Sequence, residues 1–272
     1  MSPPRTIHSE PVGKKELRVV LDGAVYRGLV IVGGQSREVV TGTDPAEVRT
    51  ELKRRAGTAQ PGYIGWGGAI NRFRQFFPNG MASEGYLDRE GSYKREARLT
   101  LLAAAPLEAA AAGRSRGDAL LRPFQRTNLL FPQEAMRVKD LLLGPLGSRF
   151  AEAAARFTLA PTNEGLRAMT DLARTHNAAT WPILTYLPFL WDPERHMFLK
   201  PEVTRSLAER VGHILADVYQ SPPDFATYEA LLDLAGAIRR HIAELEPEDG
   251  IDVQSFIWVA GGGYKDDDGV YP

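Results

Sequence analysis

Residues 62–98 read GYIGWGGAINRFRQFFPNGMASEGYLDREGSYKREAR, and they mark the change from a short β segment to a long helical one. This stretch mixes aromatic and basic side chains more densely than any other part of the chain. Ile70, Phe73 and Phe77 share one face at helical spacing, and a Pro78–Gly80 turn follows them. We therefore expect two helices joined by this turn, the second over about Ser83–Ala105, with Tyr86, Tyr93, Ala97 and Leu101 facing inward.

Upstream of this stretch, the sequence predicts a three-stranded antiparallel meander. Leu17, Val19 and Leu21 alternate along the first strand, which spans Glu16–Leu21. Asp22-Gly23 is a strong hairpin signal, because both residues tolerate positive φ. Strands are expected next at Ala24–Val32 and Ser36–Val40.

A helix should follow the meander. Asp44 is suited to the N-cap, Pro45 to the first helical position, and Gly57 to the end of the helix. Val48 and Leu52 lie four residues apart and should face the sheet. Because small β-β-β-α modules can place a sheet in a DNA groove, this unit is a candidate DNA reader as well as a plain structural module.

The remainder of the chain predicts a helical domain, so the expected fold class is α+β. Composition divides the chain into a disordered N-terminus at residues 1–15, the meander with its basic helices at 16–113, a helical domain at 114–259 and a flexible acidic tail at 260–272. The boundary is placed in the flexible stretch Ala109–Gly117. Helices are expected at 118–126, 132–143, 145–158, 162–175, Pro201–Tyr219 and Asp224–Leu245.

Two features of the helical domain carry specific expectations. Within Asp224–Leu245, helical spacing turns five apolar residues towards a core: Phe225, Leu231, Leu232, Ile238 and Ile242. The segment Trp181–Lys200 is aromatic and interrupted by prolines, which predicts burial at a junction.

Composition excludes several classes of function. The 272 residues include no cysteine, so disulfides, Cys-ligated zinc, iron–sulfur clusters and thiol nucleophiles are excluded. The five histidines show no metal-ligand spacing, and no metal site or cofactor is expected. No apolar run approaches the ~18 residues of a membrane span, and the N-terminus does not resemble a secretory signal. The expectation is a cytoplasmic protein without membrane association.

Charge is distributed unevenly along the chain. Residues 1–150 hold 23 Lys and Arg against 15 Asp and Glu, a balance of +8, and residues 151–272 have a balance of −9. Such asymmetry indicates a surface that faces a polyanion, two halves that attract each other, or charges that are simply solvated. The first alternative predicts a nucleic-acid-binding accessory or regulatory protein without catalytic residues. Its expected binding residues are Arg72, Arg74, Arg89, Lys94, Arg95 and Arg98.

Two other functions remain open from the sequence. The helical half could be a protein–protein adaptor that uses the Trp181–Trp191 surface as its anchor. Alternatively, His196 could support general acid–base catalysis, because Glu194, Arg195 and Lys200 lie nearby in the sequence. The aromatic and apolar surroundings of His196 favour instead a buried, hydrogen-bonded ring with a structural role.

Two short C-terminal segments carry a resemblance. IDVQSFIWV at residues 251–259 and HMFLKPEVT at residues 196–204 resemble uncharacterised bacterial proteins found near restriction and phage-defence genes. The resemblance covers about 18 of the 272 residues and includes no catalytic motif. It implies a bacterial, defence-associated protein with a connection to nucleic acid, and it transfers no functional residue.

Overall fold

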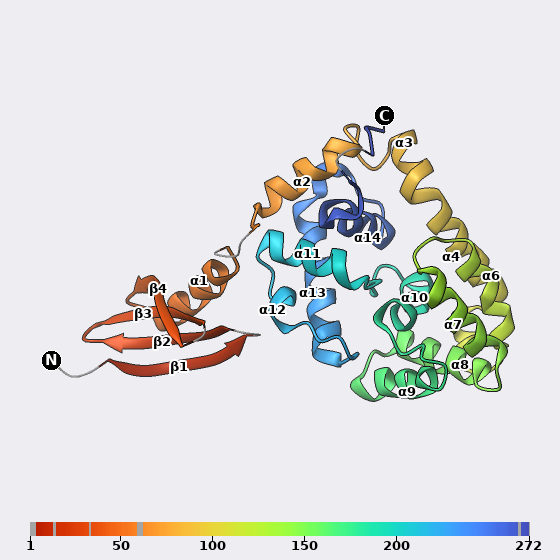
Figure 1. Ribbon diagram of the computed structural model, residues 1–272, viewed down its shortest axis with the longest axis horizontal. Coiled ribbons are helices and arrows are strands. Elements are labelled where there is room, and N and C mark those ends of the chain that lie inside the picture. The colour runs from red at the N-terminus through yellow and green to blue at the C-terminus, as the bar shows by residue number, and fades with distance from the viewer. Residues whose placement is uncertain (1–3, 13–14, 33, 59–61, 266–267, 272) are drawn as a thin grey trace. The chain divides into compact units, whose positions relative to one another are not determined.

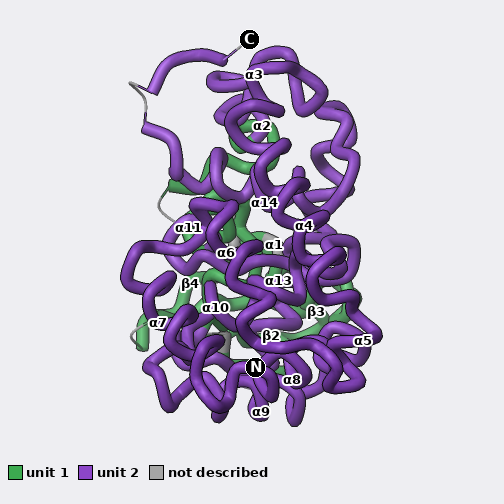
Figure 2. The backbone as a smooth tube through the Cα atoms, turned by 90° about the vertical axis from the view of Figure 1, so that its right-hand side faces the viewer, with its two compact units in different colours: residues 1–69, 205–219 green, residues 70–204, 220–272 purple. Residues whose placement is uncertain are grey.

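The computed structural model describes residues 4–12, 15–32, 34–58, 62–265 and 268–271, and it has the α+β fold expected (Figure 1). A four-stranded antiparallel sheet is followed by a mainly helical region. The chain forms two compact units, coloured separately in Figure 2: unit 1 comprises residues 1–69 and 205–219, and unit 2 comprises residues 70–204 and 220–272. The boundary expected at Ala109–Gly117 falls inside unit 2, so the two units do not divide there.

The sheet of unit 1 has the strand order β1-β2-β3-β4. The last three strands match the expected meander, with a tight turn at Gly23–Ala24 between the second and third. The first strand was not expected. The strands are β1 (Arg5–Val12), β2 (Lys15–Asp22), β3 (Val25–Val32) and β4 (Gln35–Gly42).

The prediction of disorder for residues 1–15 is wrong over Arg5–Val12. This segment pairs antiparallel with β2, from Arg5 opposite Leu21 to Val12 opposite Lys15. An edge strand needs main-chain partners on one side only, so Pro11 is tolerated there despite its missing N–H. The composition of the segment is therefore compatible with a strand once a neighbouring strand is present.

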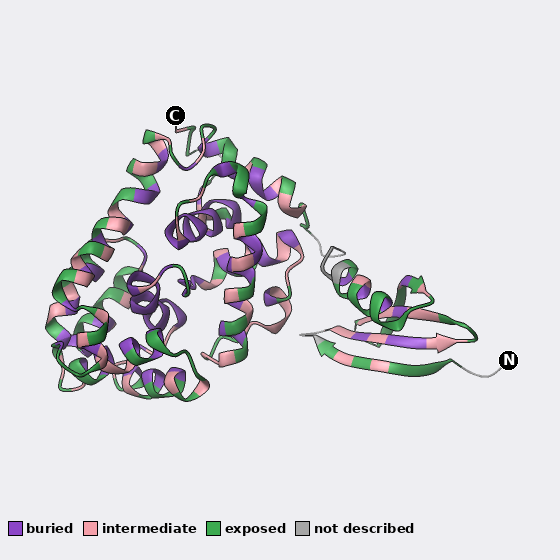
Figure 3. Cartoon of the chain, turned by 180° about the vertical axis from the view of Figure 1, so that it is seen from behind, coloured by how far each residue is buried: buried purple, intermediate pink, exposed green. Residues whose placement is uncertain are grey.

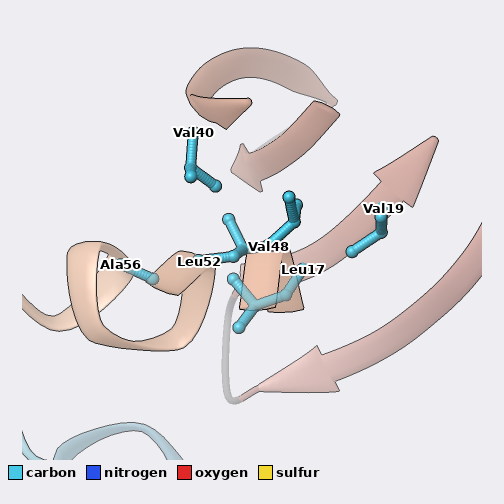
Figure 4. Packing of buried hydrophobic residues seen from close by; sticks show 6 residues of the cluster. All are labelled: Leu17, Val19, Val40, Val48, Leu52 and Ala56. Carbon is cyan, nitrogen blue, oxygen red and sulfur yellow. The ribbon is translucent and has the colours of Figure 1, made fainter. Parts of the chain in front are cut away.

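Helix α1 (Pro45–Thr58) covers one face of the sheet as predicted. Its first turn is capped by Asp44, whose Oδ1 accepts a hydrogen bond of 2.7 Å from the backbone N–H of Ala46. Val48 and Leu52 pack into the core of unit 1 (Figure 4), where the strands contribute Leu17, Val19 and Val40. The residues at helical spacing on α1 and the alternating residues on β2 thus pack together in one small core.

The carboxylate of Glu10 on β1 forms ion pairs with two basic residues of α1. Partial burial of the Glu10 carboxylate acts to raise its pKa, but hydrogen bonds from Lys53, Arg49 and His8 outweigh burial and lower the pKa to about 2. The carboxylate lies 2.9 Å from Lys53 Nζ and 3.0 Å from Arg49 Nη2. A carboxylate whose pKa falls on folding stabilises the folded state above its unfolded pKa, and this contribution disappears as pH falls through the folded pKa.

We expect Glu10→Gln to speed hydrogen exchange at the backbone amides of β1 at pH 7. The stabilisation removed is at most about 3 kcal/mol, because one pKa unit corresponds to ~1.4 kcal/mol. The difference from the unmodified protein should shrink as pH falls from 4.5, the ordinary pKa of a glutamate, to about 2, because Glu10 is protonated first in the unfolded state and then in the folded one. A difference that stays constant over this range would show that the contact does not depend on the charge of Glu10.

The rest of the chain is helical, and most of the expected helices are present. The single helix expected over Pro201–Tyr219 is wrong, because the chain ends one helix at Val211, passes through Gly212 at positive φ, and begins another at Leu215. Two α-helices are interrupted or extended by π-helical turns, η1 and η4, which the sequence did not predict. The larger elements are α2 (Gly65–Phe76), α3 (Glu84–Tyr86), η1 (Leu87–Gly91), α4 (Ser92–Ala104), α5 (Leu107–Ala111), α6 (Leu121–Gln125), α7 (Pro132–Leu143), α8 (Gly147–Leu159), α9 (Asn163–Arg174), α10 (Trp181–Trp191), α11 (Pro201–Val211), α12 (Leu215–Val218), α13 (Phe225–His241), α14 (Gly250–Trp258) and η4 (Val259–Gly263). Short 3-10 turns are η2 (Gly117–Leu120) and η3 (Ala243–Leu245).

Helix α10 is buried along its whole length, as the burial colours in Figure 3 show. Trp191 donates its indole N–H to the carbonyl of Ala105, and Trp181 donates to the carbonyl of Gln220. The expected burial of this segment is confirmed, and α10 packs against α4, α7, α8 and α9 of the same unit. The expectation that Trp181–Trp191 offers an anchoring surface to a partner protein is wrong, because none of its side chains is exposed.

Helix α13 confirms the predicted core in its main features. Leu231, Ile238 and Ile242 are fully buried, whereas Phe225 and Leu232 are only half-buried. Leu234 is also buried and was not included in the prediction.

Leu231→Ala should lower the free energy of unfolding of unit 2 by about 2–5 kcal/mol, the usual range for truncating a buried leucine. The matched change Leu232→Ala should have a smaller effect, because Leu232 is half-buried on the same helix. Urea denaturation followed by far-ultraviolet circular dichroism measures both. Equal effects of the two changes would contradict the orientation of α13.

The segment expected to be a flexible acidic tail is instead anchored in part. The Tyr264 ring packs at 5.0 Å from Phe76 and 5.7 Å from Phe77, and its hydroxyl donates to Glu90. The backbone N–H of Tyr271 donates to the carbonyl of Phe76 at 2.6 Å. Two tyrosines therefore hold this end of the chain against the aromatic helices of residues 62–98.

Candidate functional site

The predicted basic surface on α2 and η1 is partly occupied by contacts within unit 2. Arg72 lies against the Phe76 ring and donates to the carbonyl of Tyr264 at 2.9 Å. Arg74 lies 3.6 Å from the carboxylate of Glu244, with both side chains about half exposed. Arg89 is exposed, and its guanidinium stacks 4.0 Å from the centre of the Tyr271 ring.

The expectation that Lys94 faces solvent is wrong. Its side chain is buried, with the residue 0% exposed, and its Nζ donates to Glu90 at 2.6 Å and to Ser255 Oγ at 2.8 Å. The physical reason is the π-helical turn η1, which inserts one residue into the helical repeat. The buried face therefore passes from Tyr86 to Lys94, eight residues on, rather than to Tyr93 at the seven-residue spacing of an uninterrupted helix.

Arg95 forms ion pairs with acidic residues of the C-terminal half of the chain. It lies 2.9 Å from Asp252, 3.5 Å from Asp249 and 3.4 Å from Glu248. Arg98 is half-buried on the same helix. The contacts of Arg74 and Arg95 thus favour the second explanation of the uneven charge, that basic and acidic parts of the chain attract each other.

Lys94 belongs to a buried polar network that joins η1, α4 and α14. Glu90 accepts from Lys94 on one carboxylate oxygen and from the Tyr264 hydroxyl on the other, at 2.6 Å and 2.9 Å. Burial lowers the pKa of Lys94, while the Glu90 carboxylate opposes this shift. An ion pair in a dry interior is stable only when its remaining hydrogen-bonding capacity is met, and here Ser255 and Tyr264 meet it.

A cavity of about 50 Å³ opens beside this network. Its walls come from four separate parts of unit 2: the η1–α4 helix, the loop after α6, the residue before α11, and α14. The lining side chains with polar or aromatic character include Glu90, Tyr93, Lys94, Lys200, Gln254 and Trp258.

Lys200 is the second lysine of the cavity. The residue is 8% exposed, and its Nζ donates to the carbonyl of Leu129 at 3.2 Å. The ammonium lies 4.1 Å from the ring centre of Phe131 and 4.8 Å from that of Trp258, within the range of cation–π attraction. Burial lowers the pKa of Lys200. The carboxylates of Glu134 and Glu202 oppose this shift, and the positive charge of Lys94 adds to it.

Gln254 is a buried polar residue of α14. It is 2% exposed, and its side-chain oxygen has no hydrogen-bond partner among the residues that the structure describes. The Oε1 atom is a buried acceptor without a donor, and it belongs to a residue of the cavity wall. Such an atom costs about 1–3 kcal/mol unless water or a ligand supplies a hydrogen bond.

The glycines after α14 let the chain pack closely over the ring of Trp258, which lines the cavity. A side chain at Gly263 would overlap the Trp258 ring, so the chain can turn back over that ring only with glycine there. This turn, η4, is the second π-helical segment of unit 2, and π-helical turns occur frequently at functional sites. The cavity therefore lies beside both π-helical turns of the described chain.

His196 has the buried structural setting predicted for it. It is 2% exposed, Nε2 donates to the carbonyl of Thr158 at 2.9 Å, and Nδ1 accepts from the Tyr228 hydroxyl at 2.5 Å. Because a carbonyl can only accept, Nε2 carries a proton, and in the neutral ring Nδ1 is then the acceptor for the Tyr228 hydroxyl. Burial lowers the pKa of His196, which favours this neutral form. Both nitrogens are occupied, so neither is available for acid–base catalysis in this arrangement.

Sequence reasoning did not identify the cavity. Lys200 was considered only as a neighbour of His196, and Gln254 was not considered at all. A signal was present for Gln254, because it is one of few polar residues in the apolar run IDVQSFIWV. No local signal joins these two residues to Glu90 and Lys94, since they lie more than 100 positions apart in the chain.

Comparisons with known proteins add no assignment: no family model, no curated protein and no solved structure matches this chain. Within the described ranges, no set of three or more histidine or acidic side chains could hold a metal ion. None of the helices in the described residues has the length and apolar content needed to span a membrane.

Proposed function

We propose that unit 2 is a ligand-binding domain that takes the polar end of a small molecule into the cavity beside Lys94, Lys200 and Gln254. The observation that carries this proposal is the Gln254 side chain, whose oxygen is buried without a protein partner beside the cavity. Native proteins rarely leave a buried amide oxygen unbonded, so we expect water or a ligand to supply its donor.

The charged groups around Gln254 support the same function. Two lysines with lowered pKa values line one small cavity, and perturbed titratable groups in a concave site are typical of functional sites. Aromatic rings from Tyr93 and Trp258 complete the walls. Most of the remaining lining residues, Asn128 among them, are polar or charged, which suits the polar end of a ligand.

The size of the cavity limits what enters it. A volume of about 50 Å³ exceeds the ~10–15 Å³ that one water molecule requires. It accommodates a compact polar group, while the remainder of a larger ligand would extend through the opening. The bound group is therefore the head of a molecule or a very small molecule by itself.

A fragment screen by nuclear magnetic resonance tests this function. We expect small polar fragments to shift the side-chain amide resonances of Gln254 in the full-length protein, and to lose binding in Gln254→Leu. Gln75→Leu is the matched control, because Gln75 is exposed on α2. A library in which no fragment depends on Gln254 would overturn the proposal and would indicate that water alone fills the cavity.

A second candidate function is the nucleic-acid binding expected from the sequence, in a bacterial, defence-associated accessory protein. It is favoured by the +8 balance of residues 1–150 and by the exposure of Arg74 and Arg89. Lysine and arginine that neutralise phosphates release counterions, which supplies affinity without sequence preference. Lys94 and Arg95 contribute less than expected, because one is buried and the other is bound by three acidic residues.

Charge reversal at Arg74 and Arg89 together should weaken duplex DNA binding and flatten its salt dependence. The log–log slope should change by about 0.9 for each phosphate that the protein no longer neutralises. Arg174→Glu provides the control, since Arg174 is similarly exposed on α9. Fluorescence anisotropy at two salt concentrations measures the slope. Salt-independent binding, or an equal weakening in the control, would contradict this second function.

A further inference from the structure

We infer that the cavity binds a phosphate group, either as free hydrogen phosphate or as the head of a phosphate monoester, with Lys200 holding its charge and Gln254 its hydroxyl. This inference rests on the proposed ligand-binding function and names the chemical class of the ligand. It follows from the charge balance, the hydrogen-bonding groups and the size of the cavity.

The charge balance of the cavity is positive. Glu90 neutralises Lys94 at 2.6 Å. The Lys200 ammonium donates to one carbonyl and lies against two aromatic rings, and the carboxylates of Glu134 and Glu202, which do not line the cavity, offset part of its charge. One of the three N–H groups of Lys200 is directed to Leu129, which leaves donors for an anion. A cationic ligand would face two ammonium groups and is disfavoured.

The Gln254 amide distinguishes among anions. Its Oε1 accepts a hydrogen bond and its N–H groups donate, and the oxygen has no donor among the described residues. A ligand that matches both ends of the amide needs an anionic oxygen and a hydroxyl close together. Hydrogen phosphate and protonated phosphate monoesters have both on one phosphorus atom. A simple carboxylate has only acceptors and would leave Gln254 Oε1 unbonded.

The compact shape of phosphate agrees with the volume of about 50 Å³. Charge-assisted hydrogen bonds from an ammonium are stronger than those between neutral groups. The desolvated position of Lys200, between Phe131 and Trp258, strengthens its attraction for an anion further because few waters compete. Lysine acts here as a point charge, as it does in other phosphate sites.

Isothermal titration calorimetry of the full-length protein with four probes tests the inference: inorganic phosphate, methyl phosphate, formate and acetamide. We expect one-to-one binding of inorganic phosphate or methyl phosphate, tighter than that of formate. Tighter binding of methyl phosphate than of inorganic phosphate would identify a monoester as the source of the group. Lys200→Met should weaken binding roughly 10- to 100-fold, the effect of one charge-assisted hydrogen bond.

Lys139→Met is the matched control, because Lys139 is exposed on α7 and should not affect binding. In the unmodified protein, phosphate should also shift the Gln254 side-chain amide resonances, which tests the inference even if Lys200→Met fails to fold. Acetamide binding that depends on Gln254, without binding of either phosphate probe, would overturn the phosphate inference and keep the ligand-binding function. Absence of binding by all four probes would count against both.

Discussion

Replacing Lys94 by methionine should lower the free energy of unfolding of unit 2 by about 3–5 kcal/mol, the usual cost of removing one partner from a buried ion pair. Methionine has a similar length, so the change removes charge and hydrogen bonds while nearly preserving volume. The cost arises at Glu90, whose carboxylate would remain buried with only the Tyr264 hydroxyl as a partner. Ser255 Oγ would also be left without the donor from which it accepts.

A double substitution separates this explanation from a simple change in packing. Glu90→Gln combined with Lys94→Met leaves neither charge of the pair buried, so it should recover a large part of the stability. Urea denaturation of the single and double variants, followed by circular dichroism, gives the coupling energy. If Lys94→Met alone is nearly neutral, or if the double variant is less stable than the single one, the pair does not have the buried, mutually dependent geometry described.

The position of Lys94 also shows where sequence periodicity no longer predicts which residues of a helix are buried. The two helices, their turn, and the inward face of Phe73 and Phe77 were predictable, because an uninterrupted helix repeats its faces at fixed spacing. The π-helical turn at Leu87–Gly91 shifts that spacing by one residue, and no local residue pattern predicts this turn. As a result, a lysine predicted to lie on a surface is buried in the core instead.

Long-range pairing accounts for the other differences between expectation and structure. Arg5–Val12 has few apolar residues, yet it forms a strand because β2 offers main-chain partners and α1 offers Lys53 and Arg49 to Glu10. Tyr264 is held by Phe76 and Phe77, which lie far earlier in the sequence. Local composition describes the segment itself, whereas these contacts depend on partners that are distant in sequence.

The candidate site depends on the same kind of contact. Charge counts correctly indicated that basic and acidic parts of the chain differ, and they left open whether the cations face a polyanion or the acidic part. The ion pairs of Arg95 with Asp252 and of Arg74 with Glu244 answer this question for two residues only. Gln254 lies beside Glu90 and Lys94 because α14 packs near η1, which is a tertiary contact with no signature in the charge pattern.

The orientation of α14, and with it the position of Gln254, depends on Gly250 at its first turn. A Cβ added there would lie far inside van der Waals contact of the Pro193 carbonyl, and 3.0 Å from Arg239 Nη2. That carbonyl accepts a 3.0 Å hydrogen bond from Arg239, so displacing it would also break a bond to α13. Backbone atoms cannot rotate out of the way as a flexible side chain can.

We therefore expect Gly250→Ala to lower the free energy of unfolding by about 3 kcal/mol or more, at the upper end of the range for overpacking. Gly236→Ala is the matched control: the nearest atom to its added Cβ is Arg240 Nη1, at 3.5 Å on a flexible side chain. In the interior of α13, alanine should stabilise the helix by up to about 1 kcal/mol relative to glycine. Thermal denaturation of the two variants should therefore shift in opposite directions. Equal shifts would contradict the close approach of α14 to Pro193.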